Sequence, residues 1–465
     1  MPTTRHVVIV MMPSTGHVNP ALPIMAELTS RGVLVTCYIH EQFQKVVQAV
    51  GVNWRPMQRP HYLTDEQAEK YLQGQAKDSC MFPASAMPVA AAVLPSLIQE
   101  LQSLQPKPNL IAYDPFLPQG LVAAIHLQLP SVCLLSYTGP GVVHVPASVT
   151  ESWESSDAVR LAWKEIKDAY NVDLFQHGTV SEFYSPNKNT VTTFEGLFAP
   201  PESDVQKQRF GHLSFRCIGP MVMPSGDRIS HAWASEDQLA KKLPWQSIHD
   251  ALAQSKRLLF LSLGTVATSS FWARKFGPNA VSNGLEDFSG KEFVHFVLRT
   301  AFEAFAGEQD LLVIAATGPQ PDALQDLPSP PPNFILQEVV PQLEVLSKCH
   351  AFVTHGGANS LHEALALGVP LVIVPMFGDQ PFNADAVAAM GAAVSFRHPT
   401  KTLSPATLRG AVRRILDPQD DSFRAAAQRL ASQLAGMGGA KQAVDFMLGD
   451  QDESQTLAFT SASET

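Results

Sequence analysis

The segment His6-Val-Val-Ile-Val-Met-Met12, followed at once by the turn Pro13-Ser-Thr-Gly16, decides the fold class. An apolar run without polar alternation predicts a strand that is buried on both faces. A helical pattern follows from about Asn19 to Ser30, and a second strand is predicted at Val33–Ile39. Strand, glycine-containing turn, helix and strand in this order indicate the start of a parallel α/β sheet.

The same alternation returns twice along the chain. In the first half it gives a strand at Asn109–Tyr113, a helix at Phe116–Leu127 and a strand at Ser131–Leu135. In the second half, strands are predicted at Leu258–Leu263, Leu311–Ala315, Ala351–Thr354 and Leu371–Val374, and helices at Phe293–Phe305, Asn359–Leu367, Asn383–Met390, Pro405–Leu416, Ser422–Leu434 and Lys441–Leu448. Thr265–Lys291 shows no periodicity and is predicted to be a long polar loop.

This pattern predicts two doubly wound, Rossmann-like α/β domains. Residues 1–215 form the first domain, residues 216–242 a linker rich in proline and glycine, and residues 243–448 the second domain. The last helix packs on the second domain or crosses back to the first. Residues 449–465 form a polar tail. Because ligands of open α/β sheets bind at the carboxyl ends of the strands, we expect the site in a cleft between two facing domains.

Composition excludes several classes of protein. The 465 residues carry a net charge of −10 and no basic block, which argues against a nucleic-acid partner. Five scattered cysteines give no zinc-ligand spacing and fit a reducing compartment. The longest apolar stretch, Ala86–Ile98, is too short to span a bilayer, and Val7–Met12 is too short for the core of a signal peptide. We therefore expect a cytoplasmic protein without stable membrane insertion, as a monomer or weak dimer.

The stretch Met81–Leu104, rich in alanine, methionine and proline, allows two interpretations. It packs the first domain, or it lines an apolar ligand pocket.

Two polar residues follow first-domain strands. His17 lies between the first strand and its helix, where a neutral imidazole can take a proton from a bound hydroxyl. Asp114 follows the strand that ends at Tyr113, where a carboxylate can hold an imidazole in one tautomer. Each also has a purely structural interpretation, a helix cap for His17 and a turn before Pro115 for Asp114. Their pairing at two strand ends favours catalysis.

The most informative window lies in the second half, Thr354-His-Gly-Gly-Ala-Asn-Ser-Leu-His-Glu363. Small residues between a strand and a helix let the backbone approach a ligand, and the free N–H groups near Asn359 and Ser360 suit a diphosphate. Glu363, one turn into the helix, can accept hydrogen bonds from ribose hydroxyls. Asp379 and Gln380 follow the next strand and offer partners to sugar hydroxyls.

These motifs, together with Gly16-His-Val-Asn-Pro20, Leu261-Ser-Leu-Gly-Thr265, Val340-Pro-Gln342 and Gly378-Asp-Gln380, resemble nucleotide-sugar glycosyltransferases of the GT-B fold. More narrowly they resemble the UDP-glycosyltransferase superfamily, including its macrolide and plant secondary-metabolite enzymes. The resemblance extends from His6 to about Leu448. It implies a UDP-sugar as co-substrate, with UDP-glucose favoured by Gln380, a small lipophilic acceptor, and no further cofactor or metal.

The resemblance also implies roles for individual residues. His17 would be the general base and Asp114 its orienting partner. The donor would be held by the following residues: Thr265, His355, Asn359 and Ser360 at the diphosphate, Gln342 and the Val340 backbone at the base and ribose, Glu363 at the ribose, Asp379 and Gln380 at the sugar, and Gly357 as a further donor-binding residue. The family's usual tryptophan against the uracil is replaced here by Val339, and a second tryptophan of plant members by Ala358. By analogy with nucleic-acid sites, losing such a platform removes about 1–3 kcal/mol of base stacking.

The mechanism implied is a single inverting displacement, in which helix N–H groups and hydroxyls stabilise the leaving diphosphate. The spacing of Asp450 and Asp452 matches metal-using transferases, but a solvated tail is the expected interpretation. A sterol or lipid acceptor, a sugar-nucleotide epimerase and a non-catalytic binding protein remain as alternatives.

Overall fold

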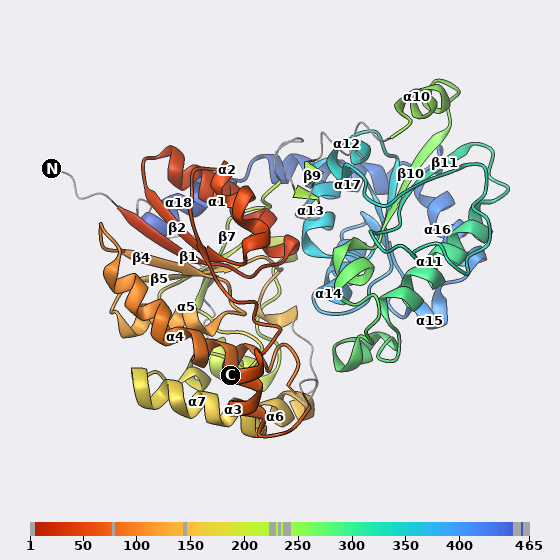
Figure 1. The fold of residues 1–465 in the computed structure, drawn as a ribbon. Helices are drawn as coiled ribbons and strands as arrows, with labels where there is room; N and C mark the ends of the chain where they lie inside the picture. Colours follow the sequence, from red (N-terminus) through yellow and green to blue (C-terminus); the bar gives the residue numbers. More distant parts are fainter. Residues whose placement is uncertain are drawn as a thin grey trace, which may run out of the picture.

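Two parallel-sheet α/β domains lie side by side in the computed structural model, as the sequence predicts (Figure 1). The structure describes residues 5–76, 80–142, 147–222, 229–230, 234–235, 243–449 and 457–458. Asp450 and Asp452 lie outside these ranges, as does most of the predicted linker. Within the described ranges, every helix is too short or too polar to cross a bilayer.

The first domain is built on an eight-stranded sheet in the order β16-β7-β6-β5-β4-β1-β2-β3. All strand pairs are parallel except β16 with β7. The strands are β1 His6–Val10, β2 Leu34–Ile39, β3 Asn53–Pro56, β4 Leu110–Tyr113, β5 Ser131–Leu135, β6 Lys188–Val191, β7 Ser214–Cys217 and β16 Leu457–Ala458. Arg216 and Cys217 therefore belong to a strand rather than to the predicted linker.

Helices cover both faces of this sheet. Val8 and Val10 of β1 point into the core on one face, and Val7 and Ile9 into the core on the other, as alternation along a strand requires. The helices are α1 Thr15–Ser30, α2 Gln44–Ala49, α3 Asp65–Leu72, α4 Ala86–Ser103, α5 Pro118–His126, α6 Ala147–Ser155, α7 Asp157–Tyr170 and α8 Asp204–Phe210.

The second domain has a six-stranded parallel sheet in the order β12-β11-β10-β13-β14-β15. Its strands are β10 Arg257–Ser262, β11 Leu311–Ala316, β12 Phe334–Gln337, β13 Ala351–Thr354, β14 Leu371–Ile373 and β15 Ala393–Ser395. Its helices are α10 Trp245–Ala253, α11 Gly290–Phe305, α12 Gln342–Leu346, α13 Ala358–Ala366, α14 Gln380–Ala389, α15 Pro399–Thr402, α16 Pro405–Ile415 and α17 Ser422–Ala435.

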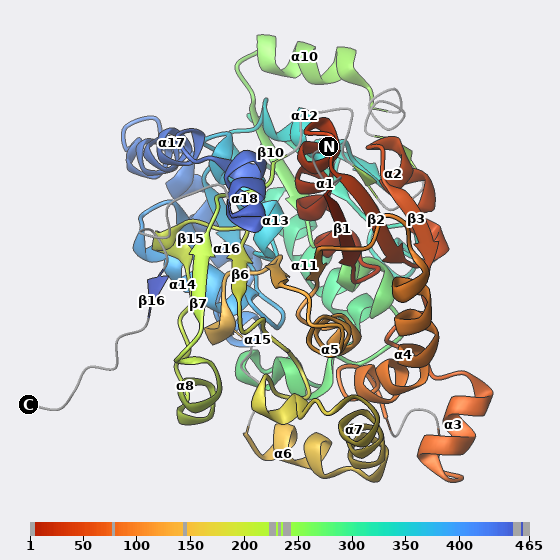
Figure 2. The ribbon, with the colours of Figure 1, turned by 90° about the vertical axis from the view of Figure 1, so that its left-hand side faces the viewer.

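The chain returns to the first domain at its end. Helix α18, Gly439–Leu448, packs Ala443, Val444 and Met447 into the core that also contains α1 (Figure 1). Arg31, which directly follows α1, forms an ion pair with Asp445 of α18 at 2.5 Å. Strand β16 then lies beside β7 at the edge of the sheet (Figure 2).

The prediction of a long polar loop at Thr265–Lys291 is wrong. The segment contains a π-helical turn at Val266–Ser270 and a 3-10 helix at Gly277–Asn283. It buries Trp272 and Phe276, and the indole of Trp272 donates to Asp322 at 2.9 Å. Its apolar residues are spaced irregularly, so neither a helical nor a strand period is visible in the sequence.

Helix α1 also differs from the prediction, because it begins at Thr15 rather than near Asn19. Ser14 is extended, and its carbonyl accepts the amides of His17 and Val18. His17 therefore lies in the first turn of α1.

Candidate active site

His17 and Asp114 meet where two adjacent strands of the first sheet, β1 and β4, end. Val10 of β1 pairs with Tyr113 of β4, so the residues that follow these strands are neighbours. The Nδ1 of His17 lies 2.6 Å from Oδ2 of Asp114, and the Asp114 side chain is 1% exposed. With Nδ1–H donating to the carboxylate, Nε2 is left as a proton acceptor.

Backbone contacts fix the carboxylate in place. The amide of Asp114 donates to the carbonyl of Val10 at 2.9 Å, and its Oδ1 accepts the amide of Phe116 at 3.1 Å. Both carboxylate oxygens are thus engaged, one by the backbone and one by the imidazole. Such a carboxylate resists rotation and holds the ring in one orientation.

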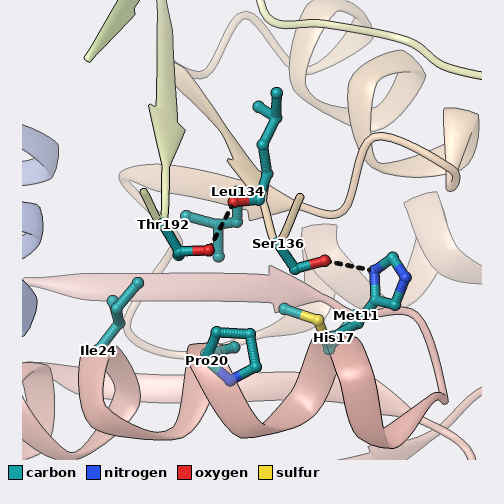
Figure 3. A pocket seen from close by; sticks show the side chains of 9 residues that line it. Met11, His17, Pro20, Ile24, Leu134, Ser136 and Thr192 are labelled. Carbon is teal, nitrogen blue, oxygen red and sulfur yellow. Dashed lines mark hydrogen bonds between the residues drawn. The ribbon is translucent and has the colours of Figure 1, made fainter. Parts of the chain in front are cut away.

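Ser136 is a second partner of the imidazole that the sequence analysis missed. It directly follows β5, and its Oγ lies 2.9 Å from Nδ1 of His17. Figure 3 shows the two side chains in a pocket between α1 and the end of β5, which Met11, Pro20 and Ile24 also line. The position of Ser136 directly after a buried strand was the sequence signal that could have indicated its role.

Aromatic side chains continue from the base into the first domain. The ring of Phe116 lies 5.4 Å from that of His17 and 5.7 Å from that of Phe82, and Phe82 lies 4.5 Å from His61. We call Phe116, Phe82 and His61 the aromatic wall. Burial lowers the pKa of His61 to about 4, so this ring is neutral at pH 7. Phe82 comes from the Met81–Leu104 stretch, whose helix α4 otherwise packs the domain core.

The N-terminus of α13 faces the first domain across the interface. Gly357 precedes the helix and provides no side-chain cap, and the first intrahelical bond runs from the amide of Leu361. Within the described residues, no group accepts from the amides of Asn359 and Ser360. Free N–H groups at a helix start bind anions.

A proline in α1 explains how α13 is docked. Pro20 has no N–H, so the carbonyl of Gly16, four residues earlier, lacks its helical donor. This carbonyl instead accepts Nδ2 of Asn359 at 2.8 Å. The bond joins the helix start that bears His17 to the helix start predicted to hold the diphosphate.

His355 is packed directly behind this helix start. It is 9% exposed, and burial lowers its pKa to about 4, so the ring is neutral. A Cβ on Gly264 would lie 2.4 Å from the ring and one on Gly357 2.5 Å from it, so both positions require glycine. Thr265, next to Gly264, is half-buried and directly precedes the π-helical turn.

Two predicted base and ribose ligands, Gln342 and Glu363, form one cluster with Ser360, which was predicted at the diphosphate. Nε2 of Gln342 donates to Oε2 of Glu363 at 2.6 Å and to Oγ of Ser360 at 3.2 Å. All three side chains and Val340 are buried, while Val339 is half-buried.

The residues predicted at the sugar behave differently from each other. Gln380 turns back on its own loop, and its Oε1 accepts the amides of Met376 and Phe377 at 2.8 and 3.4 Å. Asp379 accepts Nδ2 of Asn383 at 2.9 Å, and burial raises its pKa to about 6. Gln380 thus shapes the loop that presents Asp379.

Asn383 is a further residue that the sequence analysis missed. It is fully buried, and its Nδ2 also donates to the carbonyl of Gly356 at 2.9 Å. Its Oδ1 accepts the hydroxyl of Thr138, in the first domain, at 2.9 Å. One amide therefore links Asp379, the glycine loop and the first domain. Its position four residues after Asp379 in a helix was the available signal.

Comparisons with known proteins identify glycosyltransferases as proteins to which this chain is similar. A family model described as "Erythromycin biosynthesis protein CIII-like, C-terminal domain" matches residues 304–443. The chain is 27% identical to the NDP-glycosyltransferase YjiC of Bacillus licheniformis, over 95% of this chain and 96% of that protein. It is 24% identical to the oleandomycin glycosyltransferase of Streptomyces antibioticus, over 96% and 90%.

Solved structures share the fold over the whole chain. The glycosyltransferase of kitacinnamycin superposes with a TM-score of 0.68 at 23% identity, covering 97% of this chain and all of that one. The spinosyn rhamnosyltransferase SpnG, complexed with thymidine diphosphate, gives a TM-score of 0.62 at 18% identity, over 96% and 100%. Both domains and their arrangement therefore match a GT-B architecture.

Proposed function

Because this chain belongs to the UDP-glycosyltransferase superfamily, we propose that it moves a hexose from a UDP-sugar, with UDP-glucose as the favoured donor, to a hydroxyl of a small lipophilic acceptor. The observation that carries the proposal is the 2.6 Å pairing of His17 with buried Asp114. The same helix start is docked onto α13 through Gly16 and Asn359. A base and an anion-binding helix start thus share one interface.

The reaction is a single displacement at the anomeric carbon. Nε2 of His17 takes the proton of the acceptor hydroxyl while the hydroxyl oxygen bonds to the anomeric carbon. The bond from that carbon to the diphosphate oxygen breaks, and the nucleoside diphosphate leaves with the electron pair. Attack opposite to the leaving group inverts the anomeric configuration.

The protein supplies electrostatic stabilisation for both ends of this step. The Asp114 carboxylate stabilises the imidazolium that forms. The amides of Asn359 and Ser360 face the charge that develops on the diphosphate. Neutral His355, close behind them, offers a hydrogen bond without adding a fixed charge.

Nucleotide release from purified protein tests the proposal. UDP-glucose, UDP-galactose, UDP-GlcNAc and TDP-glucose are each supplied with and without EDTA, and with and without a panel of phenols, flavonoids and sterols. We expect release of UDP only when an acceptor is present, and equally with EDTA. Release without acceptor would instead indicate hydrolysis or epimerase-like chemistry, and silence with every donor would contradict the proposal.

A pair of histidine variants assigns the base. We expect His17→Ala to lower acceptor-dependent turnover by roughly 10²–10⁴-fold, the usual contribution of a general base, while donor affinity in calorimetry is retained. His249→Ala, at an exposed position of α10, is the matched control. Equal loss of donor binding in His17→Ala would make His17 a donor ligand.

A further inference from the structure

The aromatic wall leads from the base to two arginines, one from each domain. The charges of Arg59 and Arg274 both act on His61, at the outer end of the wall, as does the charge of His17. Arg274 belongs to the ordered 265–291 segment of the second domain. Its guanidinium lies 5.7 Å from the ring centre of Tyr62, next to His61. The 265–291 segment of the second domain therefore places the guanidinium of Arg274 against the first domain.

Neither arginine is neutralised by a carboxylate in the part of the chain that the structure describes. Among the residues that the structure describes, neither Arg59 nor Arg274 has a carboxylate within ion-pair distance. Arg59 donates to the neutral side chain of Gln42, and its Nε is buried without a hydrogen-bond partner. Glu41 is close enough to act on His40, yet forms no ion pair with Arg59. A buried donor of a cationic group without an acceptor is costly, which favours an anionic ligand there.

The order of groups along the wall constrains that ligand. His17 marks the position of the attacked hydroxyl. Phe116 and Phe82, whose ring planes lie at 85° to each other, follow in that order before His61 is reached. Aromatic side chains in this edge-to-face arrangement can contact a rigid aromatic ligand through its faces and edges. The arginine fork recognises planar oxyanions, and a carboxylate in particular.

We propose that the acceptor is a phenol of two or more rings that carries a carboxylate at the end opposite to its reacting hydroxyl. The ring system lies along Phe116 and Phe82, and the carboxylate lies between Arg59 and Arg274. This inference rests on the proposed function, because it names the acceptor class of the same site. Since the two arginines come from different domains, such an acceptor also bridges them.

A matched pair of acceptors tests the proposal on the full-length protein. 7-Hydroxycoumarin-3-carboxylic acid and its carboxamide have the same ring system and the same hydroxyl, and differ only in charge. We expect wild-type kcat/KM to favour the acid by about tenfold, as one charge-assisted contact at a partly exposed site supplies. Added salt should reduce this preference, because it screens the arginines.

Substitutions separate a charge effect from a structural one. In Arg274→Gln the ratio of kcat/KM for acid over carboxamide should fall about tenfold, through KM for the acid, and Arg274→Lys should restore part of it. Arg429→Gln, at an exposed position of α17, should leave the ratio unchanged. Arg59→Gln should lower the ratio as Arg274→Gln does.

The outcomes distinguish this inference from the proposed function. A wild type that prefers the carboxamide, or an Arg274→Gln variant that keeps the wild-type ratio, overturns the inference. Turnover of neutral flavonoids without turnover of either coumarin overturns it too and leaves glycosyl transfer standing. Absence of turnover with every acceptor and donor overturns the proposed function itself.

Discussion

Among the described residues, the imidazole of His17 has hydrogen-bond partners at Nδ1 only, Asp114 at 2.6 Å and Ser136 at 2.9 Å. The two partners are not equivalent, because only the carboxylate can stabilise the protonated ring by charge. Both Asp114 and Ser136 therefore position the imidazole, but only Asp114 also stabilises its positive charge.

This difference gives a prediction for two conservative variants. We expect Asp114→Asn to lower kcat by about 10²–10⁴-fold, since the amide cannot balance the imidazolium. Ser136→Ala should cost no more than about tenfold, since it removes one neutral hydrogen bond. Donor affinity, measured by calorimetry, should stay near wild type in both. Wild-type turnover in Asp114→Asn would show that Asp114 only shapes its turn.

Gly264 gives a second prediction at this scale. Its φ is +76°, and a Cβ there would lie 2.4 Å from the His355 ring, so Gly264→Ala combines backbone strain with a clash. We expect a lower Tm and a donor KM raised more than tenfold, because His355 is displaced from the start of α13. Gly277→Ala is the control, since Gly277 has φ +63° but no atom within 4 Å of its Cβ. Equal donor KM in the two variants would contradict the role of the clash.

The buried carboxyl of Glu182 gives a third prediction, about pH. It accepts the hydroxyls of Tyr184 at 2.5 Å and Tyr137 at 3.2 Å, and burial raises its pKa from 4.5 to about 8. Between these values the folded protein binds more protons than the unfolded chain, so this group makes stability fall as pH rises.

The variant Glu182→Gln isolates that contribution. We expect the variant and the wild type to have the same Tm near pH 4.5. The Tm of the variant should exceed that of the wild type by a margin that grows up to pH 8 and stays constant above pH 8. The amide oxygen can still accept both tyrosine hydroxyls. Thermal unfolding measured across this pH range checks it, with Tyr137→Phe as a control that keeps the carboxyl. A constant difference at all pH values would mean that the carboxyl does not titrate as burial dictates.

At the scale of elements, the missing N–H of Pro20 governs how α1 meets α13. An alanine at this position would supply a helical donor to the Gly16 carbonyl, in competition with Asn359. We expect Pro20→Ala to keep or raise the Tm while it raises the donor KM several-fold. Pro23→Ala makes the same change one turn further along α1 and is the control. A donor KM unchanged in Pro20→Ala would show that Asn359 does not depend on this carbonyl.

Elements with a clean period could be predicted, and those without one could not. The strand at His6 and the helix after Gly357 were visible because burial on two faces and a glycine turn leave a local pattern. The segment around Trp272 and Phe276 folds by contacts with Asp322 and Phe377, which lie far away in the sequence. Ser136 and Asn383 were missed for the same reason: their roles depend on His17 and Thr138, 119 and 245 residues distant.

At the scale of the whole molecule, Asn383 and Thr138 connect the two domains through a buried hydrogen bond. We expect Asn383→Ala to lower the free energy of unfolding by about 2–4 kcal/mol, since it leaves the partners of three hydrogen bonds unsatisfied. Thr138→Val should lower it by about 1 kcal/mol. Because both remove one shared contact, the double variant should lose less than the sum. Thermal unfolding of all four proteins measures the coupling, and strict additivity would contradict a direct link.

Because α18 packs on the first domain, cleavage of the chain between the two domains need not separate them. Helix α18 inserts Ala443, Val444 and Met447 into the core around α1, and its Asp445 pairs with Arg31. A protease that cuts only between residues 223 and 242 would therefore not release the second domain, because its own C-terminal helix remains built into the first. We therefore expect the two halves, expressed as separate chains, to associate through the contacts between α18 and α1.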